Sequence, residues 1–357
     1  MFNLFHKPKN IWVGVDIGST MLRLLQLSFQ NNQYRVESYV AIPVPEQSVV
    51  DGHILNVETI SHILMQAVQS LDVELENVVL ALPHTMVIEK IITMDTDMTD
   101  EEREIQVRMD IEHELPFSLD EASLDFTVLA EQPDPDTGQV NVLCVAAQTE
   151  HIETRVDIIE GAGLSAKVVD VESYAKIRAL DLMQDDWVIK QHCIAILELD
   201  PNVVKLLVVQ AGEIKYSRTH QLTKPNREHK KYQHDLLAVN QLIDAPEMNS
   251  FPQTSILDEQ SLVCLEHTMQ QIEHAFQGFI LSAQGNEINQ VYLIGEGVDL
   301  PSYLPQLQQL GYRAMIFNPL INMTCSEQVK VSTLQNDAPA LMVACGLALR
   351  GMSHGSN

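Results

Sequence analysis

Residues 12–27 read WVGVDIGSTMLRLLQL, and the pattern of this stretch returns at residues 194–209 as IAILELDPNVVKLLVV. The two stretches align at a constant offset that pairs Arg23 with Lys205. Each has the apolar alternation of a strand, then an acidic turn, then a second strand. An internal repeat of this kind predicts two similar lobes, with chance alternation in two unrelated hairpins as the alternative.

The segments around the first copy predict an α/β layered domain. Strands are expected at 11–17, 22–29, 36–42 and 78–82, with an amphipathic helix over 60–71 before the last of them. This meander, helix and returning strand are typical of a layered α/β lobe. A different pattern follows: Thr99 and Glu102 have the spacing of a capping box for a helix that ends before Pro116, and alternating strands come after it. We therefore expect a small α+β module inserted into the first lobe.

The expected organisation is an α/β, two-lobed fold with an inserted small α+β subdomain. Its predicted parts are the first lobe at 1–83, the insert at 84–150, the return to the first lobe at 151–190, the second lobe at 191–337, and a C-terminal connecting helix and tail at 338–357. A polar, loop-rich excursion is expected from Tyr216 to about Pro252.

Composition restricts the possible partners and the compartment. The chain has 22 Lys+Arg against 49 Asp+Glu, a formal net charge of −27, which excludes a general affinity for nucleic acid or anionic lipid. The five cysteines form no CxxC pair, which indicates a reducing compartment without a disulfide framework or a zinc site. No signal peptide is visible, and the longest apolar run, Ala340 to Leu349, falls short of the roughly 18 residues that span a bilayer. We expect a cytoplasmic protein that reaches a membrane only through a partner.

Three turns carry the candidate chemistry. The turn from Asp16 to Thr20 offers a glycine, hydroxyls and amides to a phosphate, and Asp16 is the expected magnesium ligand, because Mg²⁺ takes one or two carboxylates and keeps its waters. The repeat supplies a second acidic turn, and a glycine-rich loop follows a later strand. Each turn alone is more typical of an ordinary hairpin, whereas the three together favour a nucleotide site. The candidate residues are Asp16, Gly18, Ser19, Thr20, Glu198, Asp200, Asn202, Gly295, Glu296 and Gly297.

These motifs resemble those of the actin-like ATPase superfamily and, within it, the PilM family of type IV pilus assembly proteins, which is related to the division protein FtsA. The first phosphate motif matches GVDIGSTMLRLLQL (14–27), and the adenosine motif matches LIGEGVDLPSYL (293–304). The two connecting segments match VVDVESYAKIRAL (168–180) and PALMVACGLALR (339–350). The segment ALP…IEKI (81–91) also resembles the family. The resemblance runs from about residue 8 to 351, without the excursion after Tyr216. It implies an actin-like (ribonuclease H-like) fold and the cofactors ATP and Mg.

The resemblance also implies a partner and a place in the cell. It suggests a cytoplasmic component of the type IV pilus inner-membrane platform, serving pilus biogenesis and twitching motility or DNA uptake. The partner would be the N-terminal cytoplasmic tail of PilN, an extended peptide held between the insert and the first lobe, with Leu115, Pro116 and Phe117 as expected contacts. The acidic helix from Thr99 to Leu115 is either a solvated face or a surface that steers a basic flank of this peptide.

The second phosphate motif departs from the family pattern. Asp200 stands where a glycine is expected, and Pro201 after it has no N–H to offer a phosphate. We therefore expect ATP hydrolysis to be lost or very slow and nucleotide affinity to be reduced. Two rival functions remain: an active ATPase or kinase of the same fold, which needs a working second turn, and an FtsA-like filament protein, which would carry a C-terminal amphipathic membrane helix that this sequence does not show.

Overall fold

The computed structural model describes residues 12–71, 75–129, 138–182, 192–222, 259–282 and 287–354, with side chains in the helix after residue 258 described from Val263 onward. The chain divides into two compact units: unit 1 comprises residues 1–185 and 318–357, and unit 2 comprises residues 186–317. Most of the excursion predicted after Tyr216 lies outside the described residues. In the described part of the chain, no helix is both long and apolar enough to cross a membrane.

Unit 1 is built on a mixed sheet with the strand order β10-β6-β1-β2-β3-β16. Its strands are β1 (Trp12–Ile17), β2 (Met21–Gln30), β3 (Gln33–Pro43), β6 (Asn77–Leu82), β10 (Ser165–Val171) and β16 (Thr324–Cys325). The first three form an antiparallel meander, while β6 runs parallel to β1 and β10 parallel to β6. The chain returns to unit 1 at Asn318, earlier than the predicted boundary at 337, because β16 pairs with β3 through Thr324 and Arg35.

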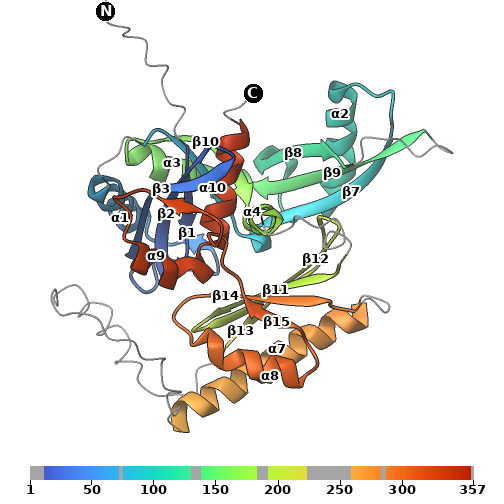
Figure 1. The fold of residues 1–357 in the computed structure, drawn as a ribbon. Helices are drawn as coiled ribbons and strands as arrows, with labels where there is room; N and C mark the ends of the chain where they lie inside the picture. The colour runs from blue at the N-terminus through green and yellow to red at the C-terminus, as the bar shows by residue number, and fades with distance from the viewer. Residues whose placement is uncertain are drawn as a thin grey trace, which may run out of the picture. The chain divides into compact units, whose positions relative to one another are not determined.

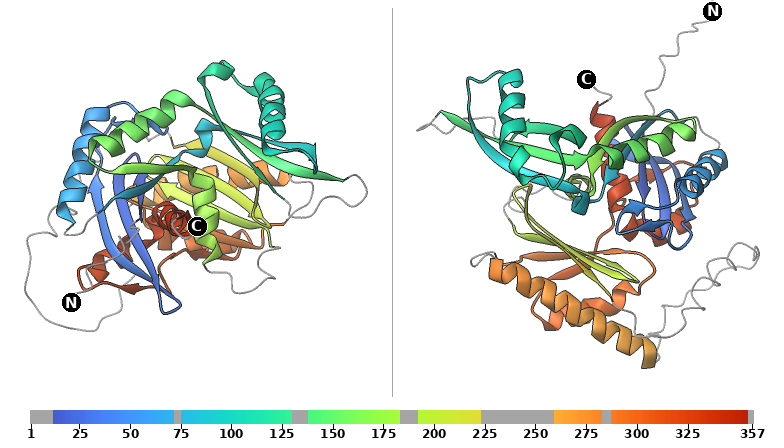
Figure 2. Two further views of the ribbon diagram at one scale, coloured as in Figure 1. Left: turned by 90° about the horizontal axis from the view of Figure 1, so that it is seen from above. Right: turned by 180° about the vertical axis from the view of Figure 1, so that it is seen from behind.

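Helices cover both faces of this sheet (Figures 1 and 2). They are α1 (Val57–Ser70) and α3 (Thr149–Gly161) on one face, and α4 (Glu172–Asp181) and α10 (Met342–His354) on the other. Side chains point alternately to the two faces of the sheet, so the core has two parts. Val13 and Val15 pack under α1 and α3, and Trp12 packs with α10. Short elements complete the unit: β4 (Val49–Val50), β5 (His53–Ile54) and α9 (Val331–Asp337).

The helix α10 lies unusually close to its neighbours because glycines stand at the contacts. A Cβ at Gly346 would collide with the carbonyl oxygen of Ala175 on α4, and a Cβ at Gly14 would lie 2.7 Å from the backbone nitrogen of Ala348. These two glycines therefore let the backbones of α10, α4 and β1 approach one another.

The inserted α+β subdomain forms a small layer of its own (Figure 1). It consists of β7 (Val87–Asp95), α2 (Asp100–Ile111), β8 (Ala122–Val128) and β9 (Gln139–Gln148), with the strand order β7-β9-β8. One face of the sheet packs against α2 through Ile92, Val142 and Ile111. The predicted capping box is confirmed, since Thr99 and Glu102 exchange side-chain and backbone hydrogen bonds at the start of α2.

Unit 2 repeats the sheet of unit 1. Its strands are β11 (Ile194–Asp200), β12 (Val203–Gln210), β13 (Glu213–Gln221), β14 (Gln290–Gly295) and β15 (Ala314–Ile316), in the order β13-β12-β11-β14-β15. This is the order of β3-β2-β1-β6-β10 in unit 1. The helices α7 (Glu259–Ser282) and α8 (Leu304–Gln309) pack on one face of the sheet, and Phe276 and Phe279 of α7 are fully buried in the core that they share with it.

The repeat extends to the hydrogen-bond ladder. In unit 1 a bulge lies between Gln26 and Leu27, and in unit 2 the corresponding bulge lies between Val208 and Val209. These positions correspond in the alignment of the two stretches. Because two chance hairpins would not share register and bulge, the predicted α/β fold of two similar lobes with an inserted subdomain is confirmed.

Candidate functional site

The first turn is a tight hairpin between β1 and β2. The Gly18 N–H donates to the Met21 carbonyl at 3.0 Å, and the Thr20 carbonyl accepts from the Val44 N–H at 2.8 Å. A Cβ at Gly18 would lie 2.9 Å from the Met21 oxygen, so the hairpin alone accounts for the glycine. The amide of Gly18 is used within the turn, and Ser19 is the exposed residue that can meet a ligand.

An ion pair lies directly behind this turn. The Asp16 Oδ2 is 3.6 Å from the Arg23 Nη1, and the two side chains are only 12% and 7% exposed. The residues are ladder partners on β1 and β2. A guanidinium can bind phosphate oxygens and a carboxylate can accept from metal-bound water, so the pair has the chemistry for a Mg-nucleotide. In the sequence, Arg23 serves only to align the repeat, and its pairing with Asp16 is visible only in the register of β1 and β2.

Unit 2 carries the same arrangement with weaker shielding. The Lys205 Nζ is 2.8 Å from the Glu198 Oε1, with exposures of 34% and 15%. The Asn202 carbonyl accepts from the Leu222 N–H at 2.6 Å, as Thr20 accepts from Val44. Asp200 closes the hairpin opposite Val203, and the exposed Pro201 has no N–H. This turn therefore offers a phosphate fewer donors than the first turn and one more carboxylate.

The glycine-rich loop packs against the second turn. Gly295 has φ 133°, and a Cβ there would collide with the carbonyl oxygen of Leu199 at the end of β11. Gly297 has φ 67°, and its Cβ would lie 3.1 Å from the Cγ of Pro201. Unit 2 thus brings the predicted adenosine motif, with Glu296 half-buried between the glycines, beside the predicted second phosphate turn. Both glycines have a structural reason that needs no ligand.

The predicted magnesium ligand has no neighbouring ligand set. Within the described ranges, no group of three or more His, Cys, Asp or Glu side chains could hold a metal ion. Asp16 alone suits a magnesium ion that keeps most of its waters and is bound mainly through a nucleotide. The residues of the first turn fit a Mg-nucleotide, whereas Asp200 and Pro201 do not fit a phosphate.

The predicted partner-binding residues follow α2, which ends at Ile111. Leu115 and Phe117 are both half-buried, with Leu115 packed against the core of the insert, and Pro116 is exposed. Pro116 therefore offers the most surface to a peptide, and the role of the three residues remains a prediction.

A buried polar group joins the insert to the rest of unit 1. The His84 Nδ1 is 3.1 Å from the Ser173 Oγ and 3.5 Å from the Glu89 Oε1. Burial, and then the charge and hydrogen bond of Glu89, raise the pKa of Tyr174 on α4. Both oxygens approach the same nitrogen of His84, so the group has no proton relay of the Ser-His-acid type. Its role is to tie β7 to α4.

The sheet face of the insert opposite α2 is exposed at Ile91. Ile91 is 55% exposed and lies opposite Leu143 in the ladder, with Val145 half-buried next to it on the same face. The strands β7 and β8 are the two edges of this sheet. An apolar face beside a free edge strand suits an extended peptide.

Comparison with known proteins gives a consistent result. The family described as type IV pilus assembly protein PilM matches residues 14–352. The solved structure of a PilM–PilN type IV pilus biogenesis complex matches with a TM-score of 0.71 and 22% identity, over 95% of this chain and 98% of that chain. The ethanolamine utilization protein EutJ from Carboxydothermus hydrogenoformans matches with a TM-score of 0.49 and 12% identity, over 96% and 90% of the two chains. MreB 5 of Spiroplasma citri bound to AMPPNP matches with a TM-score of 0.44 and 12% identity, over 98% of each chain.

Proposed function

The chain belongs to the type IV pilus assembly protein PilM family, and from that membership we propose that it is a cytoplasmic component of the pilus assembly platform. Its partner in this role is the N-terminal cytoplasmic tail of a PilN-type membrane protein, which holds it at the inner membrane. The family match over residues 14–352 is the observation that carries the proposal. Pilus biogenesis with twitching motility is the expected process, and service in DNA uptake uses the same contact.

The sheet face of the insert opposite α2 is the surface we assign to the tail. Ile91 of β7 presents an exposed apolar side chain on this face. Two residues earlier on the same strand, Glu89 contacts Tyr174 of α4. An extended tail can lie along this edge, using backbone hydrogen bonds for affinity and alternate side chains for specificity. In the segment expected at the groove, Pro116 is exposed and Leu115 and Phe117 are half-buried, with Leu115 packed against the core of the insert.

Fluorescence anisotropy with a labelled peptide of the PilN tail tests the partner and the surface separately. We expect micromolar or tighter binding to the full chain, and at least a tenfold loss in Ile91→Glu or Phe117→Glu, about 1.4 kcal/mol. Leu55→Glu is the matched control, because Leu55 is 63% exposed elsewhere on unit 1. Absence of binding at low salt contradicts the partner, whereas binding that neither insert variant weakens contradicts only the surface.

Binding of a Mg-nucleotide is the second candidate function. The buried Asp16–Arg23 pair and the exposed Ser19 favour it, and the Asp200–Pro201 turn weakens it. We propose binding through the first turn, without steady hydrolysis, because Pro201 gives the second phosphate turn no N–H and Asp200 adds a carboxylate. Calorimetric titration with Mg-ATP and a phosphate-release assay test this. Sub-micromolar affinity with sustained turnover would instead identify an active ATPase.

A further inference from the structure

The helix α2 exposes two large apolar side chains on its solvent side. Val107 and Ile111 are buried toward the sheet of the insert, with exposures of 1% and 0%. Ile105 and Met109 are 61% and 63% exposed, although they are among the largest apolar residues of the helix. At four residues apart they form a ridge on one line of the helix surface. The helix packs on its own sheet through the apolar face that carries Val107 and Ile111. The ridge of Ile105 and Met109 is a second apolar face.

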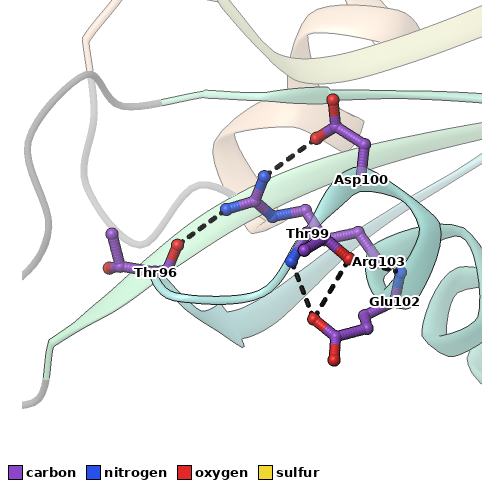
Figure 3. A network of polar contacts seen from close by, with 5 residues as sticks. All are labelled: Thr96, Thr99, Asp100, Glu102 and Arg103. Atoms are coloured by element: carbon purple, nitrogen blue, oxygen red, sulfur yellow. Dashed lines mark hydrogen bonds and ion pairs between the residues drawn. The ribbon is translucent and has the colours of Figure 1, made fainter.

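The start of α2 is firmly held (Figure 3). The Thr99 N–H donates to the Glu102 carboxylate at 2.8 Å, and these bonds lower the pKa of Glu102. Arg103 donates to Asp100 at 3.0 Å and to the Thr96 carbonyl at 2.9 Å. The ridge therefore stands on a helix whose first turn is fixed before any partner arrives, which lowers the entropic cost of association.

Carboxylates surround the ridge, and the nearby cations are already paired. Glu101 lies in α2 one turn before Ile105, and Glu112 directly follows α2, one turn after Met109. Both are exposed, and among the described residues neither has an ion-pair partner. Arg108 pairs with Glu104 at 3.0 Å on the same helix. The surface is thus an apolar stripe with net negative flanks.

We propose that this surface of α2, formed by Glu101, Ile105, Met109 and Glu112, docks a basic amphipathic helix of a partner protein. The apolar side of that helix covers the ridge, and its Lys or Arg residues face the two carboxylates. The negative charges of Glu101 and Glu112 favour a basic helix over the alternative partners. A second copy meeting the same face would bring like charges together, and an anionic membrane would be repelled. A neutral helix would desolvate two carboxylates without compensation.

This surface is separate from the one assigned to the extended tail. The ridge lies on the outer side of α2, whereas Ile91 lies on the sheet face that α2 does not cover. The same small subdomain can therefore hold two partner segments at once. The proposal does not depend on the identity of the tail, since it uses a different set of residues.

Methyl NMR on the full chain, labelled at Ile δ1 and Met ε, tests the proposal. The probe is a synthetic helical peptide of about 18 residues with leucines at i, i+3 and i+4 flanked by lysines, long enough to form helix on binding. The control peptide has glutamate at every lysine position. We expect the methyl signals of Ile105 and Met109 to shift with the basic peptide and not with the acidic one. The affinity should fall steeply with added salt.

Two variants and a control complete the test. Glu101→Lys/Glu112→Lys and Ile105→Ser/Met109→Ser should each weaken binding at least tenfold, while Leu55→Ser, an equally exposed site on unit 1, should leave it unchanged. All of these positions are exposed, so folding is not at risk. Equal binding of the acidic peptide, shifts confined to Ile91, or self-association through α2 in sedimentation would each overturn the proposal.

Discussion

The Arg23 guanidinium faces the Asp16 carboxylate across the first hairpin, and Lys205 faces Glu198 in the same register of the second hairpin. The two pairs differ in shielding, because Arg23 is 7% exposed and Lys205 is 34% exposed. Removing the cation of a buried pair leaves the carboxylate without a nearby positive charge and with little water around it. In an exposed pair, water solvates the carboxylate that remains. The same motif should therefore matter more for the stability of unit 1.

Replacing Arg23 with Met should lower the free energy of unfolding of unit 1 by about 3 kcal/mol, because the charge of Asp16 loses its facing cation in a buried place. The matched change Lys205→Met should cost less than about 1 kcal/mol. Urea unfolding followed by separate probes in each unit measures both. The double variant Asp16→Asn/Arg23→Met should have a higher free energy of unfolding than Arg23→Met alone. Equal costs for the two single variants would contradict this view.

Replacing Gly346 with Ala should destabilise unit 1 by about 2 to 3 kcal/mol, because the added methyl forces α10 away from the Ala175 carbonyl. Gly161→Ala is the control: nothing lies within 4 Å of a Cβ at this position in α3. That change should be neutral or stabilise by up to about 1 kcal/mol, since alanine is the better helix former. The unfolding temperature should therefore fall in Gly346→Ala and stay unchanged or rise in Gly161→Ala.

The hairpins could be predicted from sequence, because period-2 alternation around a polar turn is a local signal that Trp12 to Leu27 carries by itself. The insert was also predictable from its capping box at Thr99 and Glu102. The early return to unit 1 was not, because Thr324 and Cys325 have no strand pattern and pair with β3 only through tertiary contact. In the candidate site, the turn residues could be predicted from their sequence motifs. The pairing of Arg23 with Asp16 could not, because it depends on the register of the ladder between β1 and β2.

Restoring the second turn should strengthen nucleotide binding. In Asp200→Gly/Pro201→Ser the negative side chain is removed and an N–H is added at residue 201, so the affinity for Mg-ATP should rise at least tenfold over the parent chain. Calorimetric titration measures it. Asp16→Ala in the parent chain should weaken binding, because the first turn is proposed to hold the metal. An unchanged affinity in the restored variant would mean that unit 2 does not contact the phosphates.

Stability should fall in mild acid through His151. Burial, together with His53 and Arg155, lowers the pKa of His151 below its ordinary value of 6.5. The unfolded chain therefore takes up the proton first as pH falls, so this contribution is complete above about pH 6.5 and is lost as pH drops through the lowered folded value. Comparison of His151→Gln with the parent in urea unfolding at about pH 7.5 and pH 5.5 should show a flatter pH dependence. An identical slope in both proteins would exclude His151 as a source.

The discontinuity of unit 1 has a consequence for synthesis on the ribosome. Residues 186–317 emerge as one continuous segment, whereas unit 1 lacks β16 and α10 until all of unit 2 has been made. Until then the sheet surface around Trp12 and Val79, which α10 covers in the finished chain, stays open to water or to chaperones. We expect the later-encoded unit to acquire protease resistance first, and chains arrested after Phe317 should show it. The strand β1, which is made before unit 2, would thus find its packing partner α10 only after unit 2 is complete.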